Sequence, residues 1–172
     1  MKSIKLFTLS ILLTFSALES TAQFTKKTFG HVFSLDVPDY MTKTVDLNSS
    51  ATAQYQNAKK ETYLILIEDS KEELELADMK MNKKDFFDDF IKDYSTDMID
   101  FKIEPSIEFT KNGLNFIQSE LTFKSGEVDI YMIVTVIESN TYYYKLLTWT
   151  LKSYKNNYKK DFEKIINSFS EN

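Results

Sequence analysis

Two neighbouring stretches of the chain, residues 128–137 and 142–151, constrain its fold more than any other feature. They read VDIYMIVTVI and YYYKLLTWTL, and both are rich in the β-branched and aromatic residues that favour strands. Only a short segment centred on Asn140 separates them. Parallel neighbours need a crossover of about a dozen or more residues, so this spacing predicts an antiparallel hairpin.

The side chains of the first run indicate that neither face of this hairpin is polar. One face would carry Met132, Val134 and Val136, and the opposite face Ile133 and Ile137. A sheet with one wet face alternates between apolar and polar positions, so we expect cover on both faces, which helices can supply. The predicted fold is α+β, with an antiparallel sheet of about six to seven strands sandwiched between helices, an α/β/α sandwich.

Two amphipathic helices are predicted from apolar residues that recur at helical spacing. The last one carries a stripe of large side chains on one face: Tyr154, Tyr158, Phe162, Ile165, Ile166 and Phe169. Ser153 is the expected N-cap of this helix. The other helix covers residues 82–98, with Asn82 as its N-cap and Asp85 near the positive end of its dipole.

The rest of the chain is expected to supply further strands and loops. Residues 24–28 are interpreted as a lead-in, residues 39–50 as a loop, and residues 69–81 as a loop or a weak turn of helix. Pro105 should interrupt its run at a sheet edge or a bulge. The expected strands cover residues 29–37, 51–56, 62–68 and 102–110, followed by a run from Leu114 that leads into the central hairpin.

The first residues have the pattern of a secretory signal peptide. A basic start at Lys2 and Lys5 precedes an apolar stretch and the small residues Ser20 and Ala22. We expect residues 1–22 to be the signal peptide, cleaved between Ala22 and Gln23, and residues 23–172 to form a single domain. The mature protein would be exported to the periplasm or the extracellular space, with no integral membrane segment.

The charge balance argues against several classes of partner. The formal net charge is −5, and the chain contains no arginine. An acidic chain disfavours nucleic acid, and the bidentate contact that arginine makes with phosphate or guanine is missing. Nucleic acid is therefore not an expected partner.

The residue inventory offers little for catalysis or for metal binding. There is no cysteine, the only histidine is His31, and the three glycines do not form a phosphate-binding motif. The acidic groups around Glu73 and Asp89 are interpreted as solvated surface. We therefore assign no catalytic residue, no metal ligand and no cofactor, and we expect the protein not to be an enzyme.

Aromatic residues are the remaining candidates for a binding surface. Tyr142, Tyr143 and Tyr144 are consecutive, so in a strand the middle ring faces opposite to the other two. Each ring could lie in the core with its hydroxyl at the rim, or the group could be exposed. The candidate contact surface consists of these three tyrosines together with Tyr40 and Met41.

Two segments give the chain a resemblance to the PsbP-like superfamily. The segment FSLDVPDYM from Phe33 is similar to the opening of these domains, and YYYKLLTWTL followed by a helix ending in IINSF is similar to their close. The resemblance implies an α/β/α sandwich around an antiparallel sheet and a non-enzymatic binding or accessory role. It carries over no catalytic residue.

Three hypotheses of function follow. The first is an exported PsbP-like domain that binds a protein partner in the cell envelope. The second is a carrier of a small molecule or lipid in a cavity between sheet and helix, which would need an enclosed apolar pocket. The third is a hydrolase built on His31, which would need a serine and a carboxylate beside that ring.

Overall fold

The computed structural model describes residues 22–30 and 32–172. Residues 1–21 of the expected signal peptide, and His31, lie outside the described residues. No helix in the described ranges is both long and apolar enough to span a membrane.

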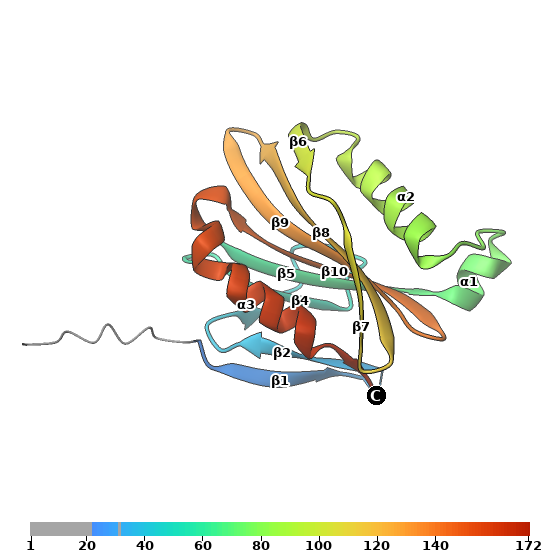
Figure 1. The fold of residues 1–172 in the computed structure, drawn as a ribbon. Helices are drawn as coiled ribbons and strands as arrows, with labels where there is room; N and C mark the ends of the chain where they lie inside the picture. The colour runs from blue at the N-terminus through green and yellow to red at the C-terminus, as the bar shows by residue number, and fades with distance from the viewer. Residues whose placement is uncertain (1–21, 31) are drawn as a thin grey trace, which may run out of the picture.

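The described residues form an α+β fold built on antiparallel strands (Figure 1). Three helices are present in them: α1 Lys71–Leu76, α2 Lys83–Ser95 and α3 Lys155–Ser168, the last preceded by a 3₁₀ turn at Lys152–Tyr154. The strands of the same ranges are β1 Phe24–Phe29, β2 Phe33–Pro38, β3 Thr42–Lys43, β4 Ala53–Asn57, β5 Thr62–Ser70, β6 Ile99–Ile103, β7 Ile107–Lys111, β8 Leu114–Ser125, β9 Val128–Glu138, β10 Tyr142–Leu151 and β11 Ser170–Glu171.

These strands divide into a large sheet and a small one. In the described part of the chain the large sheet has eight strands in the order β3-β4-β5-β10-β9-β8-β6, and β7 pairs with β8 beside β6. The small sheet has the order β1-β2-β11. The large sheet has slightly more than the six to seven strands expected. The short strand β3 was not expected, and the one strand expected at residues 102–110 is divided into β6 and β7.

The central hairpins confirm the sequence prediction. Strand β9 pairs with β10 in antiparallel register, with Leu147 opposite Val134, and β8 pairs with β9 on its other side. Gly113 and Gly126, at the turns before and after β8, have φ of +77° and +61°, which glycine adopts without steric cost. Pro105 lies between β6 and β7, both of which pair with β8, so the expected interruption is confirmed.

One face of the large sheet is covered by α3 and the small sheet together. Phe162, Ile165 and Ile166 of α3 are fully buried against Ile133 and Leu146 of the sheet. The small sheet contributes the further buried residues Phe33, Leu35 and Val37. The ring of Phe33 stacks on Phe29, with centroids 5.0 Å apart, and on Phe169 after α3, with centroids 5.7 Å apart.

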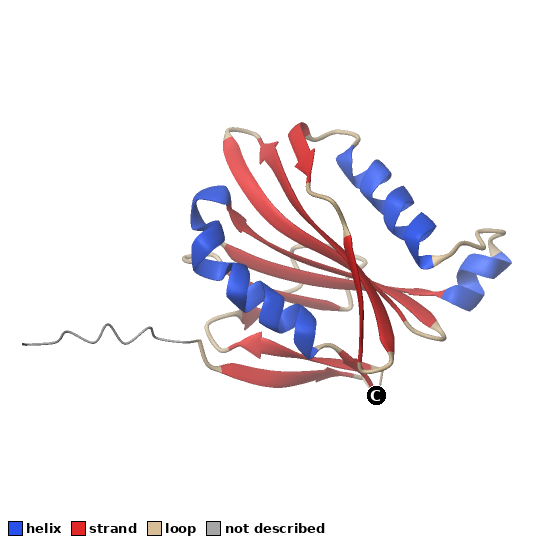
Figure 2. Ribbon diagram, viewed as in Figure 1, coloured by secondary structure: helices blue, strands red, loops and turns tan. Residues whose placement is uncertain are grey.

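The opposite face carries α2, which Figure 2 shows on the other side of the sheet from α3. Phe86 and Phe87 of α2 are buried against Val134 and Val136. The ring of Phe86 also stacks on Tyr143 with centroids 4.5 Å apart. Each face thus has a helix, as expected, but the small sheet shares the cover of one face, so the predicted sandwich is an incomplete description.

Local predictions around the helices were partly wrong. Asn82 caps α2 as predicted, since its side chain accepts a hydrogen bond from the Asp85 N–H at 3.0 Å. Ser153 does not cap α3, because it lies inside the 3₁₀ turn and the N-cap position falls to Tyr154 without a side-chain bond.

The N-terminal segment was also predicted incorrectly. The expected lead-in at residues 24–28 is strand β1, and the single strand expected at residues 29–37 is interrupted by a turn. Gly30 has φ of +55°, a conformation that suits this turn, and the chain reverses there to pair Phe29 with Phe33.

Phe162→Ala tests the assignment of the buried face of α3. The ring is fully buried, so its removal should lower the free energy of unfolding by about 3–5 kcal/mol, measured by urea unfolding. Lys160→Ala, at an exposed position of the same helix, should change it by less than about 0.5 kcal/mol. Equal unfolding midpoints for the two variants would contradict this orientation of α3.

Candidate functional site

A surface pocket lies where α1, the start of α2 and the β9–β10 hairpin meet. Its volume is about 470 Å³. We call it the hairpin pocket, and it is lined by Lys71, Leu74, Glu75, Met79, Lys80, Met81, Asn82, Asp85, Glu138 and Tyr143. In Figure 1, α1 projects at the end of β5, away from α3.

Helix α1 forms one wall of the pocket, and local contacts hold it in place. The Ser70 hydroxyl accepts a hydrogen bond from the Glu73 N–H at 3.4 Å, which caps the helix. The Lys71 N–H donates to the Thr141 carbonyl at 2.9 Å, tying the helix start to the β9–β10 turn. No residue of α1 is buried. Six-residue helices are marginal in water, so α1 depends on these anchoring contacts.

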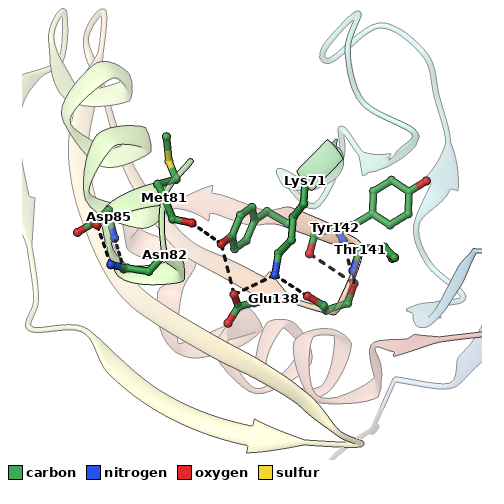
Figure 3. A network of polar contacts seen from close by, with 9 residues as sticks. Lys71, Met81, Asn82, Asp85, Glu138, Thr141 and Tyr142 are labelled. Atoms are coloured by element: carbon green, nitrogen blue, oxygen red, sulfur yellow. Dashed lines mark hydrogen bonds and ion pairs between the residues drawn. The ribbon is translucent and has the colours of Figure 1, made fainter. Parts of the chain in front are cut away.

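A polar network lies at the base of the pocket (Figure 3). The Lys71 ammonium forms an ion pair with Glu138 Oε1 at 3.0 Å and donates to the Ser139 carbonyl at 2.7 Å. It also lies 4.6 Å from the centroid of the Tyr143 ring, within the range of a cation–π contact. The side chains of Lys71 and Glu138 are both about three-quarters buried, at 26% and 24% exposure.

Tyr143 connects the hairpin to the segment between α1 and α2. Its hydroxyl donates to the Met81 carbonyl at 2.8 Å and lies 3.3 Å from Glu138 Oε1. The ring of Tyr143 also stacks on the ring of Phe86. One side chain therefore links β10, the loop before α2 and α2 itself, which fixes the shape of the pocket.

The pKa values of Glu138 and Tyr143 are both shifted away from neutral pH. Burial would raise the pKa of Glu138, but hydrogen bonds and charge from Lys71, with a hydrogen bond from Tyr143, lower it below its ordinary value. Burial and the charge of Glu138 raise the pKa of Tyr143 to about 12. General acid–base catalysis is best served by a group that titrates near the working pH, and neither residue does so.

The expected contact surface is not a single surface in the structure. Met41, Tyr143 and Tyr144 are buried, at 5%, 4% and 0% exposure, so they do not offer the exposed surface that the candidate contact surface would need. For Tyr143 and Tyr144 the structure instead matches the other reading, a ring in the core with its hydroxyl at the rim. Tyr143 and Tyr144 are buried because both faces of β10 are covered. Their hydroxyls reach polar partners at the rim, and that of Tyr144 donates to Glu171 at 2.7 Å.

The other two candidate residues, Tyr40 and Tyr142, are half-buried and lie apart. Tyr40 donates to Asp161 of α3 at 2.8 Å and lines a hollow beside Tyr158. Tyr142 lies on β10 next to α1, where it lines two further hollows. Tyr142 therefore adjoins the hairpin pocket, whereas Tyr40 belongs to the α3 side.

A second charged cluster, around Glu120, has a structural role. Glu120 accepts from Lys155 at 2.8 Å, from Lys159 and from the Tyr131 hydroxyl at 3.1 Å. Burial alone would raise the pKa of Glu120, but these hydrogen bonds lower it. The cluster ties the start of α3 to the sheet.

The structure bears on the carrier hypothesis but does not test the hydrolase hypothesis. The space between the sheet and α3 holds fully buried side chains such as Phe162 and Phe169. The hydrolase hypothesis rests on His31, which is outside the described residues. Within the described ranges, no group of three or more His, Cys, Asp or Glu side chains converges as metal ligands.

The pocket itself was missed by sequence reasoning, although one local signal was present. Ser70 followed by Glu73 is the pattern that caps a helix, and it marks the start of α1. The pairing of Lys71 with Glu138 has no such signal, because the two residues are 67 positions apart.

Comparisons with known proteins identify the fold. No family model and no curated protein matches the chain. Among solved structures, cyanobacterial PsbP (CyanoP) from Synechocystis superposes with a TM-score of 0.66 at 12% identity, covering 93% of this chain and 99% of that one.

Two further structures match in the same way. LpqN of Mycobacterium tuberculosis, described as involved in cell envelope biogenesis, gives a TM-score of 0.57 at 12% identity over 87% of this chain and 90% of that one. PA94 of Pseudomonas aeruginosa, a protein of unknown function described as a putative regulator, gives 0.55 at 10% identity over 84% and 94%. At these identities the likeness shows the fold, and the predicted PsbP-like fold is confirmed.

The lowered pKa of Glu138 predicts a specific dependence of stability on pH. A carboxyl whose pKa is lower in the folded state adds stability above its ordinary pKa of 4.5, and this is lost as the pH falls through the folded value. Wild type should therefore unfold at higher urea than Glu138→Gln at neutral pH, and the gap should close in acid below pH 4.5.

The control for this experiment is Glu127→Gln, which removes an exposed carboxyl at the turn between β8 and β9. Its midpoint should follow that of wild type at every pH. A gap for Glu138→Gln that persists unchanged in acid would show that the ion pair with Lys71 is not its cause.

Proposed function

We propose that this protein is a non-enzymatic exported domain that binds a protein partner in the cell envelope and acts as an accessory to it. The observation that carries the proposal is the hairpin pocket, an open hollow of about 470 Å³ with a pre-organised polar base. At this base Lys71 and Glu138 are paired with each other, the pKa of Glu138 is lowered, and that of Tyr143 is raised to about 12. Such a site is suited to recognition rather than to proton transfer.

The fold neighbours support an envelope role. LpqN, which shares the fold over 90% of its length, is described as involved in cell envelope biogenesis. Because one fold can carry unrelated functions, this likeness favours the proposal without identifying a partner.

The start of the described domain supports the proposed site of signal cleavage. The Gln23 carbonyl accepts a hydrogen bond from the Asp39 N–H at 2.8 Å, and β1 begins at Phe24. Cleavage between Ala22 and Gln23 would therefore leave every residue of β1 and this hydrogen bond in the mature domain.

Mass spectrometry of the protein isolated from its own cell envelope tests the export step. The mature chain should begin at Gln23, because the small residues Ser20 and Ala22 occupy the positions that signal peptidase reads. A chain that still carries residues 1–22 would contradict both the cleavage and the proposed location.

Affinity capture from an envelope extract of the producing organism tests partner binding. Met79 lines the hairpin pocket and is 49% exposed, so Met79→Glu should disturb the pocket surface without disturbing the core. We expect this variant to recover at least about tenfold less partner than wild type, as one buried charge costs more than 1.4 kcal/mol.

Val45→Glu is the matched control, since Val45 is 73% exposed and is not among the residues that line the hairpin pocket. It should recover as much partner as wild type does. If wild type enriches no protein over a bare matrix, or if both variants lose the partner equally, the proposed function or its assignment to this pocket is wrong.

A further inference from the structure

Helix α1 presents an unusually exposed surface beside the hairpin pocket. Its six residues bury no side chain, and Leu76 is 82% exposed. Tyr142 lies half-buried beside the helix, whereas Met79, just after it, lines the hairpin pocket on the other side. Hollows of about 720 and 430 Å³ flank the helix on the side of Tyr142. A large exposed apolar side chain beside such a hollow is available to a partner.

The charges on the same surface are acidic. Glu68, Glu72 and Glu73 line the larger hollow together with Thr52, Ser70, Leu76 and Tyr142. Within the described residues, no ion pair reaches Glu72 or Glu73. The one nearby lysine that faces inward, Lys71, is already paired with Glu138. The hollow therefore has an uncompensated negative potential.

Glu68 adds an independent observation. Its Oε1 accepts a hydrogen bond from the Thr52 hydroxyl at 3.1 Å. Its Oε2 is shielded from solvent and has no hydrogen-bond partner in the described part of the chain. A shielded carboxylate oxygen without a donor is unfavourable, so a donor that enters the hollow would be stabilised there.

The geometry favours an organic cation over a metal ion as this donor. The carboxylates of the described residues do not converge in a group of three that could hold a metal. A lysine or arginine side chain needs no converging set, and its aliphatic stem can lie along apolar surface. The Tyr142 ring lines the same hollow and offers a face for a cation–π contact.

We infer that the surface formed by Glu68, Glu72, Glu73, Leu76 and Tyr142, here called the α1 surface, docks a basic segment of the partner protein. Lysine or arginine side chains of that segment contact the glutamates, and an adjoining aliphatic side chain covers Leu76. This inference rests on the proposed function and adds the chemistry of the partner to it. Charge complementarity identifies the occupant, since the surface is acidic and the chain as a whole has a net charge of −5.

A binding experiment with defined peptides tests the charge requirement. The probes are a fluorescent peptide that alternates lysine with leucine, and a second peptide with glutamate in place of each lysine. Fluorescence anisotropy with the full mature protein should show binding of the lysine peptide alone. Its affinity should fall at least about tenfold between low and physiological salt, as expected for exposed charges.

The decisive variant is the double substitution Glu72→Gln and Glu73→Gln. It should weaken binding of the lysine peptide at least about tenfold and remove most of the salt dependence. Asp89→Asn with Asp93→Asn neutralises two exposed carboxylates on α2 and should change affinity less than about twofold. Circular dichroism and urea unfolding of both double variants establish that they fold.

Each remaining outcome has a definite meaning. Equal weakening by the two double variants, or equal binding of the glutamate peptide, overturns the inference. If the Glu72→Gln, Glu73→Gln protein still captures the envelope partner as wild type does, the inference is wrong while the proposed function stands. If wild type captures no partner, both fail. A dimer of wild type that dissociates in this variant would identify a second copy as the occupant and would likewise overturn the inference.

Discussion

The structure depends on one constraint: neither face of the central strand β9 is polar between Ile130 and Ile137. Ile133 and Ile137 of β9 point to one side, Val134 and Val136 to the other, and all four are fully buried. Apolar burial is worth about 25 cal/mol per Å², so exposure of either face would remove much of the stability of the domain. Strands β1 and β2, helix α3 and the long connection between β5 and β6 therefore fold back as cover.

Polar contacts then fix how each cover is placed. Glu120 holds α3 through Lys155 and Lys159, and Tyr143 joins α2 and the preceding loop to β10. Apolar packing is not directional, so it does not by itself fix where each helix lies on the sheet. These hydrogen bonds and ion pairs do fix it. On the α2 side the hairpin pocket lies between α1 and the start of α2, with the ion pair of Lys71 and Glu138 at its base.

The parts of the fold that could be predicted from sequence are those with a strong local period. The β9–β10 hairpin, α2 with its Asn82 cap and the buried stripe of α3 all follow from spacing within about a dozen residues. Strand β1 could not be predicted, because FTKKTF shows no apolar alternation and is ordered by its pairing with β2. Strand β11 has only two residues, and Ser170 pairs with Ser34 across most of the chain.

The candidate site was less predictable than the fold for the same reason. Tyr143 was a candidate from composition, but its bond to the Met81 carbonyl joins residues 62 positions apart. The aromatic cluster could be read either as core with hydroxyls at the rim or as an exposed surface, and double-sided burial of β10 places two of its three rings in the core. Of the three rings only that of Tyr142 is half-exposed, and it lies beside α1. Its place in the fold, rather than its being aromatic, makes it part of the α1 surface.

The central claim is that a rigid two-sided sheet carries a marginal α1 region that is available for a partner. Amide hydrogen exchange measures both parts in one experiment. In the free protein, amides of residues 71–82 should exchange by local opening, orders of magnitude faster than those of β9 and β10, which should exchange only on global unfolding. When the envelope partner is added, protection should rise in residues 71–82 and around Tyr142. Protection of α1 equal to that of β9 in the free protein, or a partner that protects the exposed side of α3 instead, would contradict the claim.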